Sequence, residues 1–161
     1  MILAPRHPER GDALAHSLRA QGWNVAQRSK GEPCRAETEI YLADTLGEMG
    51  LWYRLAPVSF VGGSLVEIGG HNPFEPAGLG SAILFGPNHQ NFAAVYKRLL
   101  EANAALCVEN AESLAATLEE VLSPDVAARY ATAAWDVSSE GAQVTDNVLE
   151  HLTPYLAALE D

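Results

Sequence analysis

The sequence predicts an α/β fold: a Rossmann-like three-layer domain with a mostly parallel sheet of about six strands and a helical C-terminal tail. Short apolar runs of strand length alternate with helical patterns from residue 2 to residue 122. This alternation favours parallel strands joined by helical crossovers, with helices on both faces of the sheet. The 161 residues contain no internal repeat, low-complexity run or linker, so a single domain spanning residues 1–161 is expected.

The first helix is expected from about Pro8 to Gln21. Proline suits the first turn of a helix, where its missing N–H would have no acceptor, and Gly22 provides the stop. Shorter helices are predicted at Glu48–Leu55 and Pro73–Gly80, and residues 30–38 are expected to form an exposed loop. The expected strands are Ile2–Ala4, Val25–Arg28, Ile40–Ala43, Val58–Val61, Ala82–Phe85 and Ala105–Val108.

Three later segments have the spacing of helices with one apolar face, and the chain is predicted to be helical from Ser123 onward. The apolar positions are Phe92, Val95, Tyr96, Leu99 and Leu100 in the first segment, Leu114, Leu118, Val121 and Leu122 in the second, and Val144, Val148, Leu152 and Tyr155 in the third.

The composition excludes several classes of protein. With 48% hydrophobic and 19% charged residues, the chain is too apolar for intrinsic disorder. Its uncharged stretches, such as residues 55–66, are interrupted by proline and glycine and fall short of the roughly 18 apolar residues of a membrane helix. The opening residues are not expected to form a signal peptide, and a soluble chain is expected. Cys34 and Cys107 lie far apart, which is typical of a reduced intracellular protein.

The charge is unevenly distributed along the chain. It has 10 Lys and Arg against 21 Asp and Glu, and the resulting net charge of −11 argues against a nucleic-acid partner. Six of the ten basic residues nevertheless lie within residues 1–35. This cationic zone suits a small anionic ligand, although a solvated helix face produces the same pattern.

Ligands of parallel sheets bind beyond the carboxyl ends of the strands, so the residues that follow each strand are the candidate sites. Arg6 leaves the first expected strand just before a helix begins. A guanidinium beside the free backbone N–H groups of a helix start can clamp a phosphate or a carboxylate. The alternative is a surface arginine paired with Glu9 or Asp12.

The run Asp44–Glu48 ends the third expected strand and opens a helix. Asp44 and Thr45 are both suitable N-cap residues, and capping explains the spacing as well as a ligand does. In the functional alternative, the backbone around Leu46 and Gly47 binds the edge of a nucleobase, and Gly47 permits close approach.

The run most typical of a binding site is residues 60–76, where two glycine pairs enclose a short loop and Asn72 precedes a helix. Glycines at this density let the backbone wrap an anionic group without Cβ clashes. Asn72 and Glu75 have the spacing of a capping box, which needs no ligand. A glutamate in that turn can equally accept hydrogen bonds from a ribose diol. Spacing does not separate the two roles.

Several well-known sites are absent from the sequence. It contains no phosphate-binding P-loop and no dinucleotide-binding glycine fingerprint. Ser64 lacks the final glycine of a nucleophile elbow, which disfavours it as a nucleophile. His71 and His89 have no further ligand at metal-binding spacing, so no metal site is expected.

Several segments, taken together and in order, resemble one family. They are Ala4–Arg10, Asp44–Glu48, Phe60–Leu65, Gly69–Pro76, and Phe85–Pro87 followed by Asn91 and Phe92. The combination resembles the C-terminal domain of 3-deoxy-D-manno-octulosonic acid (Kdo) transferases of lipopolysaccharide biosynthesis and covers most of the chain. The resemblance implies one half of a GT-B glycosyltransferase that transfers Kdo from CMP-Kdo to a lipid A precursor with inversion. CMP-Kdo is the substrate, and no cofactor or active-site metal is implied.

The same resemblance assigns roles to individual residues. It implies that CMP is held by Pro5 and Arg6, that the base pocket is lined by Leu46, Gly47 and Glu48, and that ribose and phosphate are bound by Asn72, Pro73, Phe74 and Glu75. The glycine loop would face the Kdo sugar, with weaker candidate contacts at Gly62, Gly63, Ser64, Gly69, Gly70 and His71.

The resemblance also implies a part that residues 1–161 do not include. In the family, an amino-terminal domain binds the acceptor, associates with the cytoplasmic side of the bacterial inner membrane and supplies the glutamate general base. That domain and the first strand of the present one are expected to be absent, so no residue here is expected to be catalytic and the chain alone is expected to be inactive. Two alternatives stay open: a stand-alone module that binds a nucleotide or another anion, and a GT-B domain that uses a UDP-sugar.

Overall fold

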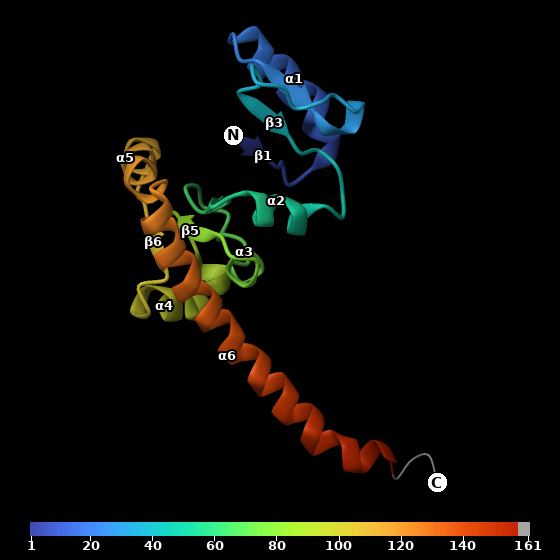
Figure 1. The fold of residues 1–161 in the computed structure, drawn as a ribbon, viewed down its shortest axis with the longest axis vertical. Helices are drawn as coiled ribbons and strands as arrows, with labels where there is room; N and C mark the ends of the chain where they lie inside the picture. Colours follow the sequence, from blue (N-terminus) through green and yellow to red (C-terminus); the bar gives the residue numbers. More distant parts are fainter. Residues whose placement is uncertain (158–161) are drawn as a thin grey trace. The chain divides into compact units, whose positions relative to one another are not determined.

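The computed structural model describes residues 1–157, and the side chains of residues 1–140. The chain divides into two compact units, Met1–Ala56 and Pro57–Asp161, which we describe separately as unit 1 and unit 2 (Figure 1). Each unit contains a parallel three-stranded sheet, so the predicted α/β class and the six parallel strands are confirmed. The strands are divided between two sheets, because within the described residues β1 (Ile2–Leu3) and β4 (Val58–Val61) each pair with one neighbour only.

The sheet of unit 1 has the order β1–β3–β2, with β3 (Ile40–Leu42) between β1 and β2 (Val25–Gln27). A 3-10 turn, η1 (Pro8–Arg10), leads into α1 (Gly11–Ala20), which packs against β2. A second 3-10 turn, η2 (Arg28–Lys30), follows β2, and α2 (Met49–Leu55) closes the unit. The predicted start of the first helix at Pro8 and the boundaries of these strands, to within one residue, are confirmed.

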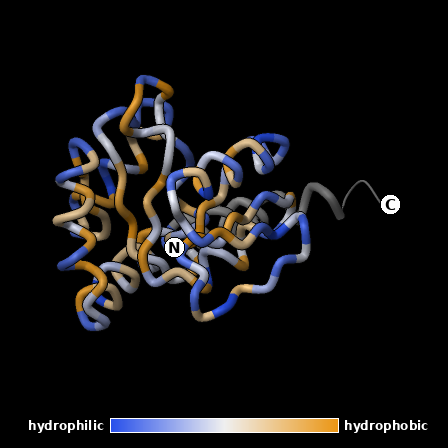
Figure 2. The backbone as a smooth tube through the Cα atoms, turned by 90° about the horizontal axis from the view of Figure 1, so that it is seen from above, coloured by the Kyte–Doolittle hydropathy of each residue, from blue (hydrophilic) through white to orange (hydrophobic). Residues whose placement is uncertain are grey.

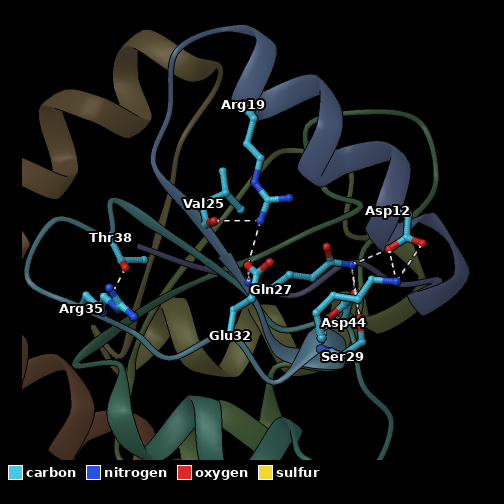
Figure 3. Close-up of polar contacts among 10 residues, drawn as sticks. Asp12, Arg19, Val25, Gln27, Ser29, Glu32, Arg35, Thr38 and Asp44 are labelled. Carbon is cyan, nitrogen blue, oxygen red and sulfur yellow. Dashed lines mark hydrogen bonds and ion pairs between the residues drawn. The ribbon is translucent and has the colours of Figure 1, made fainter.

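Two side chains cover the outer edge of β2 (Figure 3). Arg19 Nη2 donates to the carbonyl oxygen of Val25 at 2.9 Å, and Glu32 Oε2 accepts from the backbone N–H of Gln27 at 2.8 Å. Arg19 and Glu32 also pair with each other at 2.8 Å. An edge strand otherwise offers such groups to another strand, so this ion pair completes the sheet. Glu32 belongs to the predicted loop, and residues 31–38 indeed contain no helix or strand.

The sheet of unit 2 has the order β4–β5–β6, with β5 (Ala82–Phe85) between β4 and β6 (Ala105–Cys107). Its helices are α3 (Phe74–Gly78), the 3-10 turn η3 (Gln90–Phe92), α4 (Ala93–Glu101), α5 (Ala111–Val121) and α6 (Pro124–Ala157). The long helix α6 packs against α3 and β5, whereas α4 packs against β6 (Figure 1).

The core of unit 2 is built around β5, all four residues of which are buried. Tyr96 and Leu99 of α4 and Ala134 of α6 are fully buried against it. The helical coils in Figure 2 alternate between hydrophobic and hydrophilic residues, as expected of helices with one face on a core. Two predicted core positions are wrong, because Leu100 is 41% exposed and Leu122 is 55% exposed.

Each of these two leucines lies at the margin of its apolar stripe. Leu100 is one position beyond the buried Leu99, and Leu122 is the C-cap after the last turn of α5. The third predicted stripe, Val144, Val148, Leu152 and Tyr155, lies outside the residues whose side chains are described. Within residues 1–157, no helix has both the length and the apolar character needed to cross a membrane.

Candidate functional site

The carboxyl ends of β1, β2 and β3 lie at one edge of the unit 1 sheet, because the three strands are parallel. Arg6 follows β1 and is exposed. The two carboxylates considered as its partners are engaged elsewhere, since Glu9 lies 3.4 Å from His7 Nδ1 and Asp12 lies 3.0 Å from Lys30 Nζ. No ion pair to Arg6 is found among the described residues. The alternative of a paired surface arginine is therefore wrong, and the guanidinium is available to an anion.

Asp44 is buried and binds back to the end of β2 (Figure 3). Its Oδ1 accepts from the backbone N–H of Ser29 at 2.9 Å, and its Oδ2 accepts from the Ser29 hydroxyl and from Gln27 Nε2, each at 2.7 Å. Burial raises the pKa of Asp44, but these hydrogen bonds outweigh burial and hold it below its usual value. Capping of α2 by Asp44 or Thr45 is wrong, because Glu48 occupies the N-cap position and no side chain caps there.

Glu48 is held by Arg28, the residue that follows β2. Arg28 Nη2 donates to Glu48 Oε1 at 2.6 Å and Arg28 Nε donates to Glu48 Oε2 at 3.1 Å, which makes the pair bidentate. The hydroxyl of Thr45 donates to the same carboxylate. Protein donors therefore already occupy the Glu48 side chain, one of the three residues predicted to line a base pocket.

The other two predicted pocket residues form an exposed turn. Leu46 is 83% exposed, and Gly47 has a φ of 80°, a backbone conformation that favours glycine. No heavy atom lies within 4 Å of the position that a Cβ would take at Gly47. The backbone N–H groups of Leu46 and Gly47 donate to no acceptor in the described part of the chain. The turn thus presents free backbone donors beside a glycine that permits close approach.

The ion pair makes Glu48 unusually acidic. The hydrogen bond from Arg28 lowers the pKa of Glu48 from the usual 4.5 to about 2. A carboxylate whose pKa is lowered in the folded state stabilises the fold when the pH is above its pKa in the unfolded state. That stabilisation is lost as the pH falls through its pKa in the folded state. We therefore expect the contribution of Glu48 to decline between about pH 4.5 and pH 2. Carboxyl-carbon NMR should give a Glu48 midpoint near 2 that Arg28→Gln moves towards 4.5, and an unchanged midpoint in Arg28→Gln would contradict this.

In unit 2, Ser64 ties the glycine loop to the neighbouring strand. Its side chain is fully buried, and its hydroxyl donates to the carbonyl oxygen of Val61 at 2.6 Å and accepts from the N–H of Gly86 at 2.8 Å. Its own carbonyl oxygen accepts from the N–H of Asn88 at 2.9 Å. Ser64 therefore joins the ends of β4 and β5, and its hydroxyl does not face solvent.

The glycine pairs close the loop that Ser64 begins. The N–H of Gly70 donates to the carbonyl oxygen of Gly63 at 2.9 Å, and the N–H of Asn91 donates to that of Gly69 at 3.0 Å. Gly63, Gly69 and Gly70 all have positive φ angles, between 70° and 97°. Gly62, in contrast, has no heavy atom within 4 Å of its Cβ position. The loop is a compact structure with an open approach at Gly62.

Two histidines lie beside this loop. The Nε2 atom of His71 is 3.2 Å from the Cβ position of Gly63, and the carbonyl oxygen of His71 accepts from the hydroxyl of Tyr96 at 2.9 Å. His89 follows β5, with Nδ1 3.2 Å from the carbonyl oxygen of Gly86 and its ring packed edge-on against Phe85. The sequence disfavours His89 as a metal ligand and predicts no other role for it, whereas here it supports the loop. In the described residues, no cluster of His, Cys, Asp and Glu could hold a metal ion.

The segment at the start of α3 separates the roles of Asn72 and Glu75. Asn72 Oδ1 accepts from the N–H of Phe74 at 3.0 Å, but Pro73 is the N-cap residue of α3 and no side chain caps the helix, so the predicted capping role of Asn72 is wrong. The reciprocal bond of a capping box, from the Asn72 N–H to Glu75, is not made, and no residue of the described chain pairs with the Glu75 carboxylate. Glu75 is exposed and Pro73 is buried. The carboxylate of Glu75 is consequently free to accept from a ligand.

The cationic zone of residues 1–35 is smaller than the sequence suggested. Ion pairs engage three of its six basic residues: Arg19, Arg28 and Lys30. The three without an ion pair in the described part of the chain are Arg6, Arg10 and Arg35. Of these, Arg6 is the nearest in sequence to the carboxyl end of a strand, since β1 ends at Leu3.

Sequence reasoning missed the surroundings of Arg28. Its guanidinium lies 5.8 Å from the centre of the Trp52 ring, besides pairing with Glu48. The predicted strand included Arg28, whereas β2 ends one residue earlier at Gln27. The strand-end rule that selected Arg6 would have selected Arg28 had the boundary been known.

No protein-family model matches the chain. The chain is 34% identical over 158 residues to the 3-deoxy-D-manno-octulosonic acid transferase of Haemophilus influenzae and 32% identical over 159 residues to that of Rickettsia typhi. These matches cover 97% of the chain but only 37% and 34% of the two relatives, so the chain spans about a third of their length.

A solved structure matches more evenly. The crystal structure of the C-terminal CMP-Kdo-binding domain of WaaA from Acinetobacter baumannii is similar with a TM-score of 0.80 and 36% sequence identity. The match covers 84% of the present chain and 72% of that domain.

Proposed function

Because the chain belongs to the 3-deoxy-D-manno-octulosonic acid (Kdo) transferase family, we propose that it is the donor-binding half of such an enzyme and binds CMP-Kdo. The observation that carries this proposal is the similarity to a CMP-Kdo-binding domain across 72% of that domain at 36% identity. A binding role suits the chain, since its candidate residues are cations, carboxylates and backbone donors with no catalytic pair among them.

The free polar groups of the two units support individual assignments. Pro5 and Arg6 hold the CMP, with the unpaired guanidinium facing the phosphate, and Glu75 accepts from the ribose diol. The free backbone of Leu46 and Gly47 binds the base. The remaining contacts are proposed for Glu48, Asn72, Pro73 and Phe74, with the loop residues Gly62, Gly63, Gly69, Gly70 and His71 towards the Kdo sugar. Ser64 positions that loop through its buried hydrogen bonds to Val61 and Gly86.

We further propose that the whole protein transfers Kdo to a lipid A precursor with inversion at the cytoplasmic face of the inner membrane. An inverting transfer needs a general base directed at the acceptor hydroxyl. The relatives are about three times as long as this chain, which leaves room for an acceptor domain that supplies the base. Residues 1–161 would then bind the nucleotide sugar and would be inactive alone.

Titration of the chain with CMP, followed by ligand-observed NMR, tests the donor site. Wild-type protein should bind saturably, and Arg6→Ala and Glu75→Ala should each weaken binding about tenfold, because each removes a charge-assisted hydrogen bond. Arg10→Ala and Glu112→Ala are matched controls: Arg10 is another exposed arginine without an ion pair in the described chain, and Glu112 is in the first turn of α5. Both should leave the affinity unchanged.

Three outcomes would count against the proposal or its residue assignments. A folded wild-type chain that binds no CMP would favour the stand-alone anion-binding module, and tighter binding of UDP than of CMP would favour a UDP-sugar donor. Equal losses in the target and control variants would show that net charge, not these side chains, governs binding.

A further inference from the structure

The exposed turn of residues 45–47 is held at both of its ends by the same short segment. Asp44 precedes the turn and accepts from the N–H and hydroxyl of Ser29. Glu48 follows the turn and accepts two hydrogen bonds from Arg28. Adjacent residues at the end of β2 therefore hold the two carboxylates that flank the turn.

The turn has little other support. Leu46 is 83% exposed, no atom approaches the Cβ position of Gly47, and neither residue donates a backbone hydrogen bond in the described part of the chain. Such a turn would sample many backbone conformations if its ends were free. Its conformation therefore depends on the two carboxylates and their donors.

Arg28 is itself held in place. Its guanidinium lies over the ring of Trp52, 5.8 Å from the centre. Trp52 is 7% exposed and packs against Tyr41 with ring centres 5.6 Å apart. The ring that contacts Arg28 is therefore fixed in the core of unit 1. A planar fork that donates two parallel hydrogen bonds is a property of arginine that lysine does not share.

We infer that Arg28 is a positioning residue for nucleobase recognition, acting through Glu48 on the backbone of Leu46 and Gly47. This inference rests on the proposed CMP site. At two adjacent positions of the pairing edge, cytosine has a donor and an acceptor where uracil has an acceptor and a donor. A backbone that hydrogen-bonds to this edge therefore discriminates between the two bases only when its own groups are fixed. In this proposal, Arg28 contacts the protein and not the base. By fixing the backbone, it determines the preference of the site for cytosine over uracil.

The test compares three ligands in the full 161-residue chain by ligand-observed NMR: CMP, UMP and ribose 5-phosphate, which lacks the base. Arg28→Lys keeps the charge and removes the fork. It should weaken CMP binding about tenfold and bring the CMP-to-UMP affinity ratio close to one, with ribose 5-phosphate binding unchanged. Arg19→Lys is the matched control, because Arg19 forms a similar pair with Glu32 at the edge of β2. It should alter none of the three affinities.

The coupling through Glu48 is tested separately. Glu48→Gln should lower the CMP-to-UMP ratio as Arg28→Lys does, and the double variant should lose no more than either single variant. An unchanged ratio in Arg28→Lys, or an equal loss of ribose 5-phosphate binding, would overturn the positioning role while leaving the CMP site intact. A wild-type chain that binds none of the three ligands would overturn the proposed function, and this inference with it.

Discussion

Gly86→Ala should destabilise unit 2 by about 3 kcal/mol, a large effect for one methyl group. A Cβ at this position would lie 2.3 Å from the carbonyl oxygen and 2.5 Å from the carbonyl carbon of Ser64. These are backbone atoms of a buried residue, so no side-chain rotation relieves the contact. Relief requires the loop to withdraw, and withdrawal breaks the bonds from Gly86 and Asn88 to Ser64. An unsatisfied buried N–H adds to the cost.

Urea unfolding of unit 2 can be followed through the indole N–H NMR signal of Trp135, the tryptophan of α6. The matched control is Gly62→Ala in the same loop, because Gly62 has no atom within 4 Å of its Cβ position and no positive φ. Gly62→Ala should leave the midpoint unchanged or raise it slightly, since alanine restricts the unfolded chain. Similar midpoints for Gly86→Ala and the wild type would contradict the contact.

The sequence was sufficient to predict the elements of this fold. Val58–Val61 and Ala82–Phe85 have the predicted boundaries, because a short apolar run bounded by proline and glycine has few other readings. The division into two sheets was not predictable in the same way. Strand pairing depends on contacts between residues distant in sequence, and apolar periodicity does not encode which strands are neighbours.

The sequence predicted the features of the candidate site that depend on backbone conformation, but only some of the features that depend on side-chain partners. The positive φ angles of the glycine loop follow from its composition. The engagement of Glu48 by Arg28 joins residues 20 positions apart, and the burial of Ser64 depends on Gly86, 22 positions away. Such partners are set by the tertiary fold, which a motif does not specify.

Gly11→Ala and Asp44→Ala should each destabilise unit 1 by about 2–3 kcal/mol, for opposite reasons. A Cβ at Gly11 would lie 2.1 Å from Asp44 Oδ2, and the carboxylate cannot retreat because it is buried among donors from Gln27 and Ser29. Asp44→Ala removes the acceptor and leaves the N–H of Ser29 without its partner. The first substitution overfills the buried space around the Asp44 carboxylate, and the second leaves that space empty.

This opposition makes the double variant informative. In Gly11→Ala/Asp44→Ala, the new methyl group enters space that the carboxylate has vacated, so the combined loss should fall below the sum of the single losses by at least about 1 kcal/mol. The indole signal of Trp52 reports on unit 1 during urea unfolding, while that of Trp135 in unit 2 serves as the internal control. Additive losses would mean that Gly11 and Asp44 act independently. In that case the buried carboxylate would not be what requires a glycine at the start of α1.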